Sequence, residues 1–241
     1  KFSFSLISLY PYILISLILA VLYMTNAWDG IIYFGLTALI LFFLHRRISL
    51  QNAKLPTNFQ LKSSIFYFLS SIFLLIAGFF LFSLPFNLNF KPFVHGLGVV
   101  GGWEAAKFLG LLGEGSAAVV RFGPFLLEKG NNLHSPWWML LVLWGFFYFV
   151  AASFIIFIRK TIKQFNNLTI PDVFILILIF LSTLLLIFPE FFYIKDIYPL
   201  HYRANTMFKL GYQAFIMLAL SSAYIFVRLI SAGKKQILKI F

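Results

Sequence analysis

The stretch "VFILILIFLSTLLLIFPEFF", residues 173–192, decides the class of this protein. Glu190 is the only charged residue within this long apolar stretch. An apolar run of about 18 residues or more is long enough to cross a bilayer as a helix. Similar runs recur along the chain, in which 61% of the 241 residues are hydrophobic and only 11% are charged. The sequence therefore predicts an all-α, polytopic membrane protein and argues against a soluble domain.

Six spans are predicted, and the whole chain, 1–241, is interpreted as a single transmembrane helix bundle. The long segment 83–136 between the third and fourth spans is expected to carry short interfacial helices. Within it, "WEAAKFLGLLGEGSAAVVRF" (103–122) can form an amphipathic helix on the membrane surface, with a short re-entrant piece as the alternative. The chain opens on Lys1 rather than Met, which favours a processed product or one part of a larger protein. The predicted spans are roughly residues 5–24, 30–44, 64–82, 137–158, 173–192 and 208–229.

The charges predict an orientation. The connections 45–63 and 159–169 and the C-terminal tail hold most of the Lys and Arg and no acidic residue, which is typical of cytoplasmic segments. Both termini are then cytoplasmic, and the chain is expected in the plasma membrane. Of the seven acidic residues, all except Asp172 fall on the external face. Chemistry or binding is therefore expected on that face.

Composition also narrows the function classes. The net charge of +12 fits cytoplasmic loops better than nucleic-acid binding, and the absence of cysteine excludes disulfides and thiolate chemistry. The stretch "KPFVHGLGVVGG" (91–102) resembles a phosphate-binding glycine loop only superficially, since it lacks the GK[ST] ending. Nucleotide binding is therefore disfavoured.

The beginning of the last span carries a polar stripe. Asn205, Lys209, Tyr212 and Gln213 recur at spacings of three and four residues and so share one helix face. Asn205 or Thr206 can cap this helix, which leaves free N–H groups and the positive dipole end for an anion such as phosphate. Arg203 precedes the helix and Lys209 follows one turn inside. The alternative is that Lys209 snorkels to the headgroups and Arg203 anchors the interface.

A second group of candidates precedes this stripe. Glu190 ends an apolar span and is expected to pair with Arg203 or Lys209, since the connection between the two spans is short. It also suits a carboxylate that faces a polar substrate. Lys195, Asp196 and His201 follow in the same connection. Glu190, Asp196 and His201 could ligate a divalent metal, but their spacing matches no strong ligand pattern, so the cofactor stays unknown.

Two further candidates lie elsewhere on the external face. Asp29 in "TNAWDG" (25–30) is interpreted either as part of a tight turn beside a membrane-interface Trp or as a group lining the same external cavity. His95 follows Lys91 in the long external segment. It could contact an anion, although a lone loop histidine is more often simply solvated.

Three stretches carry a resemblance to a known family, in the order expected for it: "MTNAWDGIIY" (24–33), "LPFNLNFKP" (84–92) and "RANTMFKLGYQAF" (203–215), the last preceded by "EFFYIKD" (190–196). Together they resemble signature segments of the YYY-type family of uncharacterised archaeal and bacterial membrane proteins. The chain departs from that pattern at Ala204, Leu210 and Gly211, where the family has larger or aromatic residues. Family members are usually longer, so the chain is similar to their C-terminal half.

The family in turn is similar to C-type membrane glycosyltransferases, and this resemblance implies a function. The donor would be a polyprenyl-phosphate-linked sugar on the external face. Arg203, Lys209 and Lys195 would bind the carrier phosphate, and Asp29 or Glu190 would orient the sugar or the acceptor. The expected partners are membrane lipid, the lipid-linked sugar and an upstream half or other membrane subunits. The alternative is a non-catalytic subunit or scaffold whose polar residues hold helices together or bind lipid headgroups.

Overall fold

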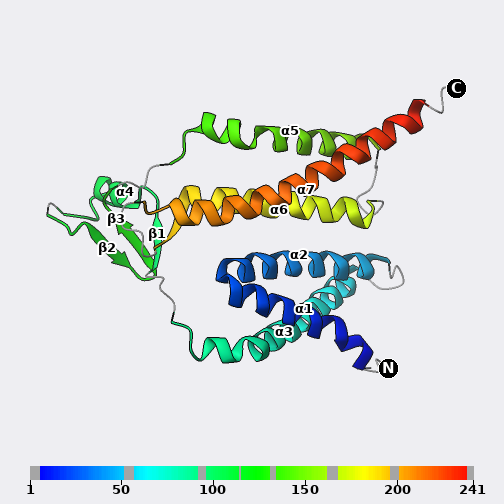
Figure 1. The fold of residues 1–241 in the computed structure, drawn as a ribbon, viewed down its shortest axis with the longest axis horizontal. Helices are drawn as coiled ribbons and strands as arrows, with labels where there is room; N and C mark the ends of the chain where they lie inside the picture. Colours follow the sequence, from blue (N-terminus) through cyan, green and yellow to red (C-terminus); the bar gives the residue numbers. More distant parts are fainter. Residues whose placement is uncertain are drawn as a thin grey trace. The chain divides into compact units, whose positions relative to one another are not determined.

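The computed structural model describes residues 6–51, 57–91, 96–113, 115–130, 134–161, 168–195 and 201–237. The chain divides into two compact units, Lys1–Lys91 (unit 1) and Pro92–Phe241 (unit 2). The described residues of unit 1 form helices, whereas unit 2 combines long helices with a small sheet (Figure 1).

Unit 1 consists of three mutually packed helices, α1 (Leu6–Thr25), α2 (Ala27–Gln51) and α3 (Thr57–Asn87). Small residues allow the close approach of α1 to α3, because a Cβ added at Gly78 would lie 2.6 Å from the Oγ atom of Ser16. Such contacts between small residues are typical of helix packing in membranes. Polar groups join all three helices at another level, where the Ser71 hydroxyl on α3 lies 2.8 Å from Tyr12 Oη and 2.9 Å from His45 Nε2.

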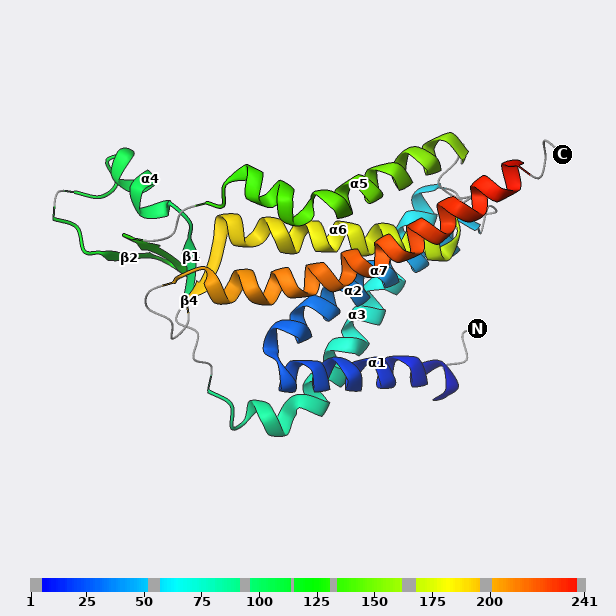
Figure 2. The ribbon, with the colours of Figure 1, turned by 45° about the horizontal axis from the view of Figure 1, so that its top comes forward.

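The helical part of unit 2 contains α5 (Trp137–Thr161), α6 (Ile170–Phe191) and α7 (Ala204–Ile237), with α7 packed against both of the others (Figure 2). Thr169 caps α6, since its hydroxyl accepts a hydrogen bond from the amide of Asp172 at 3.3 Å. At its other end α6 passes into a strand without a loop, because Phe192 has extended backbone angles.

The sheet of unit 2 has four short strands, β1 (Gly96–Val99), β2 (Val119–Phe122), β3 (Phe125–Glu128) and β4 (Phe192–Lys195), in the order β2-β3-β1-β4. The central strand β1 runs parallel to β3 and antiparallel to β4. A short helix, α4 (Gly102–Phe108), packs beside the sheet and buries Trp103 against Leu127. The strand β4 continues directly from α6, so the sheet is attached to the helices.

The predicted class is confirmed. Within the part of the chain that the structure describes, five helices are long and apolar enough to cross a membrane: Ala27–Ser49, Leu61–Asn87, Trp137–Lys160, Ile170–Phe191 and Ala204–Ala232. The first predicted span, 5–24, corresponds to α1, whose described apolar part, Leu9–Thr25, is shorter than these five. The chain is therefore a polytopic helical membrane protein with one small sheet.

The segment 103–122 does not form the single amphipathic helix that its sequence favours. Instead α4 ends at Phe108, and the chain then reaches β2 at Val119. Gly110 and Gly115 have positive φ angles of 71° and 87°, which a continuing right-handed helix does not allow. The glycines of 96–98 likewise form a strand rather than a phosphate loop.

Candidate functional site

Two of the predicted polar residues of unit 2, Glu190 and Arg203, meet where α5, α6 and α7 approach the sheet, a region called the sheet end below. Arg203 Nη2 lies 2.7 Å from Oε1 of Glu190, and both side chains are largely buried, with exposed fractions of 7% and 14%. The prediction that Glu190 pairs with Arg203 or Lys209 is thereby confirmed with Arg203. The short connection between α6 and α7 makes this pairing possible.

Two further hydrogen bonds fix the same carboxylate. The backbone amide and the hydroxyl of Ser135, just before α5, each donate a hydrogen bond of 2.8 Å to the carboxylate of Glu190. Arg203 Nε also donates to the carbonyl oxygen of Pro189 at 2.7 Å, which satisfies one of the free carbonyl groups at the end of α6. Ser135, Glu190 and Arg203 thus join the segments next to three helices, and we call them the sheet-end clamp.

A second cluster lies on one face of the sheet. Glu128 on β3 is almost fully buried, and Lys195 Nζ on β4 lies 2.9 Å from its Oε1 atom. The hydroxyl of Tyr193 donates to Oε2 of the same carboxylate at 2.7 Å. Lys195 Nζ also lies 4.0 Å from the ring centroid of Tyr202, which stacks on Tyr193. We call these four residues the sheet cluster.

Glycine on β1 makes the sheet cluster possible. Gly98 lies between Leu126 of β3 and Tyr193 of β4 in the sheet register. A Cβ atom added at Gly98 would overlap the Tyr193 ring, which is fully buried. The absence of a side chain on β1 therefore lets Tyr193 reach across this strand to Glu128 on β3.

The beginning of α7 differs from the prediction. The helix starts at Ala204, so Asn205 and Thr206 belong to its first turn and neither precedes it as a cap. The hydroxyl of Thr206 instead accepts a hydrogen bond from the amide of Ile194 at 3.0 Å. This bond ties α7 to β4, while the Tyr212 ring stacks on Phe208.

The predicted stripe on α7 holds in part. Asn205 and Lys209 are partly exposed, and Gln213, one turn further, is buried with 7% of its side chain exposed. Tyr212 is more exposed than these three residues, with an exposed fraction of 58%. His201, just before α7, is exposed as well.

The remaining predicted residues stand as follows. Asp29 lies in unit 1, in the first turn of α2, where a carboxylate is favourable at the positive end of the helix dipole. Only Asn26 separates α1 from α2, so the connection is shorter than the predicted turn. Asp196 and His95 lie outside the described residues. Among the residues that the structure does describe, no three His, Cys, Asp or Glu side chains gather as metal ligands.

The sequence predicts the charged residues of the sheet end, but not every residue that binds them. Ser135 was not singled out, although a Ser-Pro pair directly before an apolar helix signals a helix start that can bind a carboxylate. It also missed the opposite end of unit 2, where Asp172 is buried. There Tyr224 donates to Asp172 at 2.8 Å, Arg228 Nε lies 3.3 Å away, and Thr169 donates at 2.6 Å. We call these four residues the opposite-end clamp.

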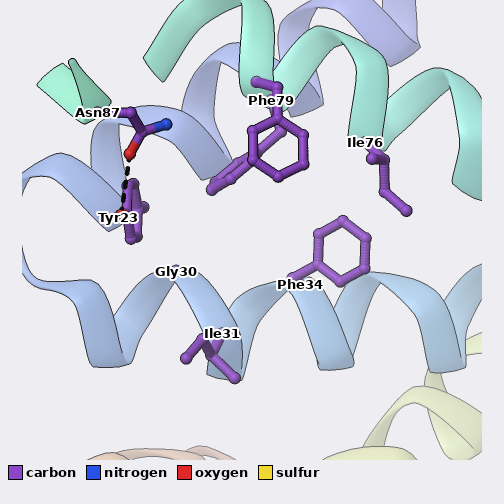
Figure 3. A pocket seen from close by; sticks show the side chains of 8 residues that line it. Tyr23, Gly30, Ile31, Phe34, Ile76, Phe79 and Asn87 are labelled. Carbon is purple, nitrogen blue, oxygen red and sulfur yellow. Dashed lines mark hydrogen bonds between the residues drawn. The ribbon is translucent and has the colours of Figure 1, made fainter. Parts of the chain in front are cut away.

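Unit 1 has a cavity of its own, of about 400 Å³, between α2 and α3 (Figure 3). Its walls are almost entirely apolar, with Ile31 and Phe34 on α2 and Phe79 on α3. Asp29 is not among the described residues that line it.

Comparison with known proteins gives one clear relationship. Residues 4–218, most of the chain, match the family described as uncharacterized membrane protein (DUF2298). No curated protein and no solved structure matches the chain.

Proposed function

This chain belongs to the DUF2298 family of uncharacterized membrane proteins, and we propose that it is the phosphate-binding module of a C-type-like membrane glycosyltransferase. Its ligand is a lipid carrier with a phosphate-linked sugar, bound at the sheet end of unit 2. The resemblance of "RANTMFKLGYQAF" (203–215) to the YYY-type segments motivates the choice of ligand.

One observation carries this proposal: polar side chains continue along α7 inside a candidate membrane span. With a rise of about 1.5 Å per residue, Lys209 lies about 7 Å and Gln213 about 13 Å beyond the first residue of the helix. Gln213 is nevertheless buried within the bundle. Polar groups inside spans are costly and usually face a site or a water-filled cavity.

The chemistry follows from charge. As a glycosidic bond to a carrier phosphate breaks, negative charge develops on the leaving phosphate, and a fixed cation lowers the barrier. We assign this role to Lys209, which is partly exposed. Asn205 and Gln213 then orient the phosphate or the sugar.

The geometry supports a positioning role for Arg203 and Glu190 rather than direct ligand binding. Arg203 and Glu190 form an ion pair with each other, and Ser135 donates two hydrogen bonds to the same carboxylate. The sheet-end clamp in this proposal holds the beginning of α7 in place, so that Lys209 keeps a fixed position. Lys195 is occupied in the same way by Glu128. Asp29 remains a candidate on sequence grounds alone.

A second candidate function is a non-catalytic scaffold, favoured by the same pairing. Glu128, Glu190 and Asp172 are all held by cations and hydroxyls of the chain itself. Buried pairs of this kind are found where helices must be held in one arrangement. In this case the polar residues hold the bundle together and bind no substrate.

The deciding experiment compares Lys209→Ala with Lys160→Ala, a matched removal of one cation from the opposite end of unit 2. Purified protein in lipid nanodiscs is titrated with a polyprenyl-phosphate probe, and sugar transfer is measured in membranes. A charge-assisted contact contributes about 1.5–3 kcal/mol, so Lys209→Ala should weaken binding by about 10- to 100-fold. Lys160→Ala should leave it unchanged. Equal binding by both variants, with thermal stability intact, would reject the proposal and leave the scaffold.

A further inference from the structure

The cavity of unit 1 has a polar end and an apolar end. At one end the hydroxyl of Tyr23 donates to Asn87 Oδ1 at 3.0 Å, and Asn87 in turn donates to Ser83 at 2.9 Å. The rest of the lining consists of aliphatic and aromatic side chains and one glycine (Figure 3). An occupant should therefore be amphiphilic, with most of its length apolar.

The shape of the cavity is elongated. Its lining residues on α3 extend from Ile76 to Asn87, which at about 1.5 Å per residue is a length of about 16 Å along the helix. Its volume of about 400 Å³ is in the range of small-molecule sites. An apolar site of this length suits a hydrocarbon chain better than a compact ligand.

The cavity opens on the side of candidate membrane spans. Ile31, on its α2 wall, is 71% exposed, and Phe80, on its α3 wall, is 58% exposed. Both helices are long and apolar enough to cross a bilayer, so the opening lies along two candidate spans.

A cation lies near the polar end. The chain continues past Asn87 in a helical turn, since the amide of Phe90 donates to the carbonyl of Phe86 at 2.8 Å. Exposed Lys91 follows Asn87 by four residues, and a cation at this place would complement a negatively charged phosphate.

The cavity is framed by rigid groups. The Tyr23 ring lies 5.3 Å from that of Phe79 and 5.6 Å from that of Phe86. Gly30 allows α2 to approach, because an added Cβ would lie 2.6 Å from Cβ of Tyr23. Aromatic side chains with few rotatable bonds keep such a site open.

We propose that this cavity is a binding site for a membrane phospholipid, with one acyl chain between α2 and α3 and the phosphate near Asn87 and Lys91. The site lies within unit 1 alone, and it does not depend on the proposed function of unit 2. Such a lipid stays with the protein when bulk lipid is removed.

The test uses the full chain, purified in a mild detergent and examined by native mass spectrometry for bound phospholipid. Ile31→Trp fills the opening, and Ile48→Trp is the control, since Ile48 is a 57% exposed isoleucine on α2 that does not line the cavity. The wild-type protein and Ile48→Trp should each retain one phospholipid. Ile31→Trp should lose at least 90% of it. Ile76→Trp, with Phe73→Trp as its control on α3, repeats the test from the other wall.

Photochemical labelling identifies the occupant. A phosphatidylglycerol probe with a diazirine near the end of one acyl chain should label Phe34 or Phe79 several-fold more than Phe73. Equal labelling at all three positions would show ordinary bulk lipid and overturn the proposal. Labelling by a polyprenyl-phosphate probe alone, or cross-linking of the cavity to protein, would also overturn it.

Discussion

Glu190 shows at the scale of one residue how a carboxylate can look catalytic and yet be held by the fold. It accepts two hydrogen bonds from Ser135 and forms an ion pair with Arg203. Hydrogen bonds and a cation stabilise the charged form of a buried carboxylate, so the contacts of Ser135 and Arg203 both stabilise the charged form of Glu190. Removing one partner leaves the others buried without compensation.

We therefore expect Glu190→Ala to destabilise unit 2 by about 3–5 kcal/mol, the usual effect of leaving a buried charge alone. The measurement is unfolding of the purified protein in detergent, followed by circular dichroism against denaturant. Glu190→Leu combined with Arg203→Leu should recover part of this loss, because no lone charge remains. If the double variant loses more free energy of unfolding than Glu190→Leu and Arg203→Leu lose together as single variants, this explanation is contradicted.

Gly98 is a second residue whose importance follows from geometry. Gly98→Ala places a methyl group where the Tyr193 ring lies, and overpacking of this kind costs about 1–3 kcal/mol. Gly113→Ala is the matched control, since no atom lies within 4 Å of its added Cβ. Proteolysis of the sheet in folded protein should rise for Gly98→Ala only. Equal protection of both variants would show that the sheet tolerates a side chain on β1.

The helices α6 and α7 form a hairpin that is fixed at both ends. Asp172 in the opposite-end clamp and Glu190 in the sheet-end clamp are 18 residues apart on α6, or about 27 Å at 1.5 Å per residue. This separation is close to the thickness of about 30 Å of the hydrocarbon core. The two clamps are therefore expected where polar groups are least costly, near the two surfaces of the bilayer.

The opposite-end clamp gives a prediction for this hairpin. Asp172→Asn and Arg228→Leu should each lower stability, and a double-mutant cycle should give a coupling energy of about 0.5–3 kcal/mol. Arg159→Leu, in the last turn of α5 and not in the clamp, is the control for loss of a cation. Additive effects of Asp172→Asn and Arg228→Leu would mean that their 3.3 Å contact contributes nothing to the hairpin.

The long helices could be predicted from the sequence, whereas the sheet could not. The predicted span 137–158 lies within α5 and 173–192 overlaps α6, because long apolar runs specify membrane helices locally. The strand β4 is only four residues long and directly follows α6. Its partner β1 is about 100 residues away in the sequence, so no local pattern reveals the pairing.

The same distinction applies to the candidate site. The Glu190–Arg203 pair was predictable because a short connection brings the ends of two spans together. The Lys195–Glu128 pair was not, because it depends on the order of strands in the sheet. The interpretation of Lys195 as a phosphate ligand did not include Glu128, because the sheet that brings the two residues together could not be predicted from the sequence.

At the scale of the whole chain, the connections 45–63 and 159–169 and the C-terminal tail combine Lys and Arg with no acidic residue. In unit 2, Arg159 and Lys160 end α5, and Arg228 lies near the same end of the bundle, whereas the sheet end carries the acidic residues Glu128 and Glu190 together with cations. Lys and Arg are enriched on the cytoplasmic side of membrane proteins. The sheet is therefore expected on the external side.

The chain contains no cysteine, so this orientation can be tested with single cysteines in an otherwise unreactive protein. Lys107→Cys on α4 and Lys160→Cys at the end of α5 replace exposed residues. In intact cells a membrane-impermeant maleimide should label Lys107→Cys only, because α4 lies beside the sheet, which is expected on the external side. Lys160→Cys should react only after the membrane is permeabilised, and Lys62→Cys, exposed near the beginning of α3, should behave in the same way. The reverse pattern would place the sheet in the cytoplasm, where the lipid-linked donors of external glycosyl transfer are not presented, and the proposed function of α7 would fail with it.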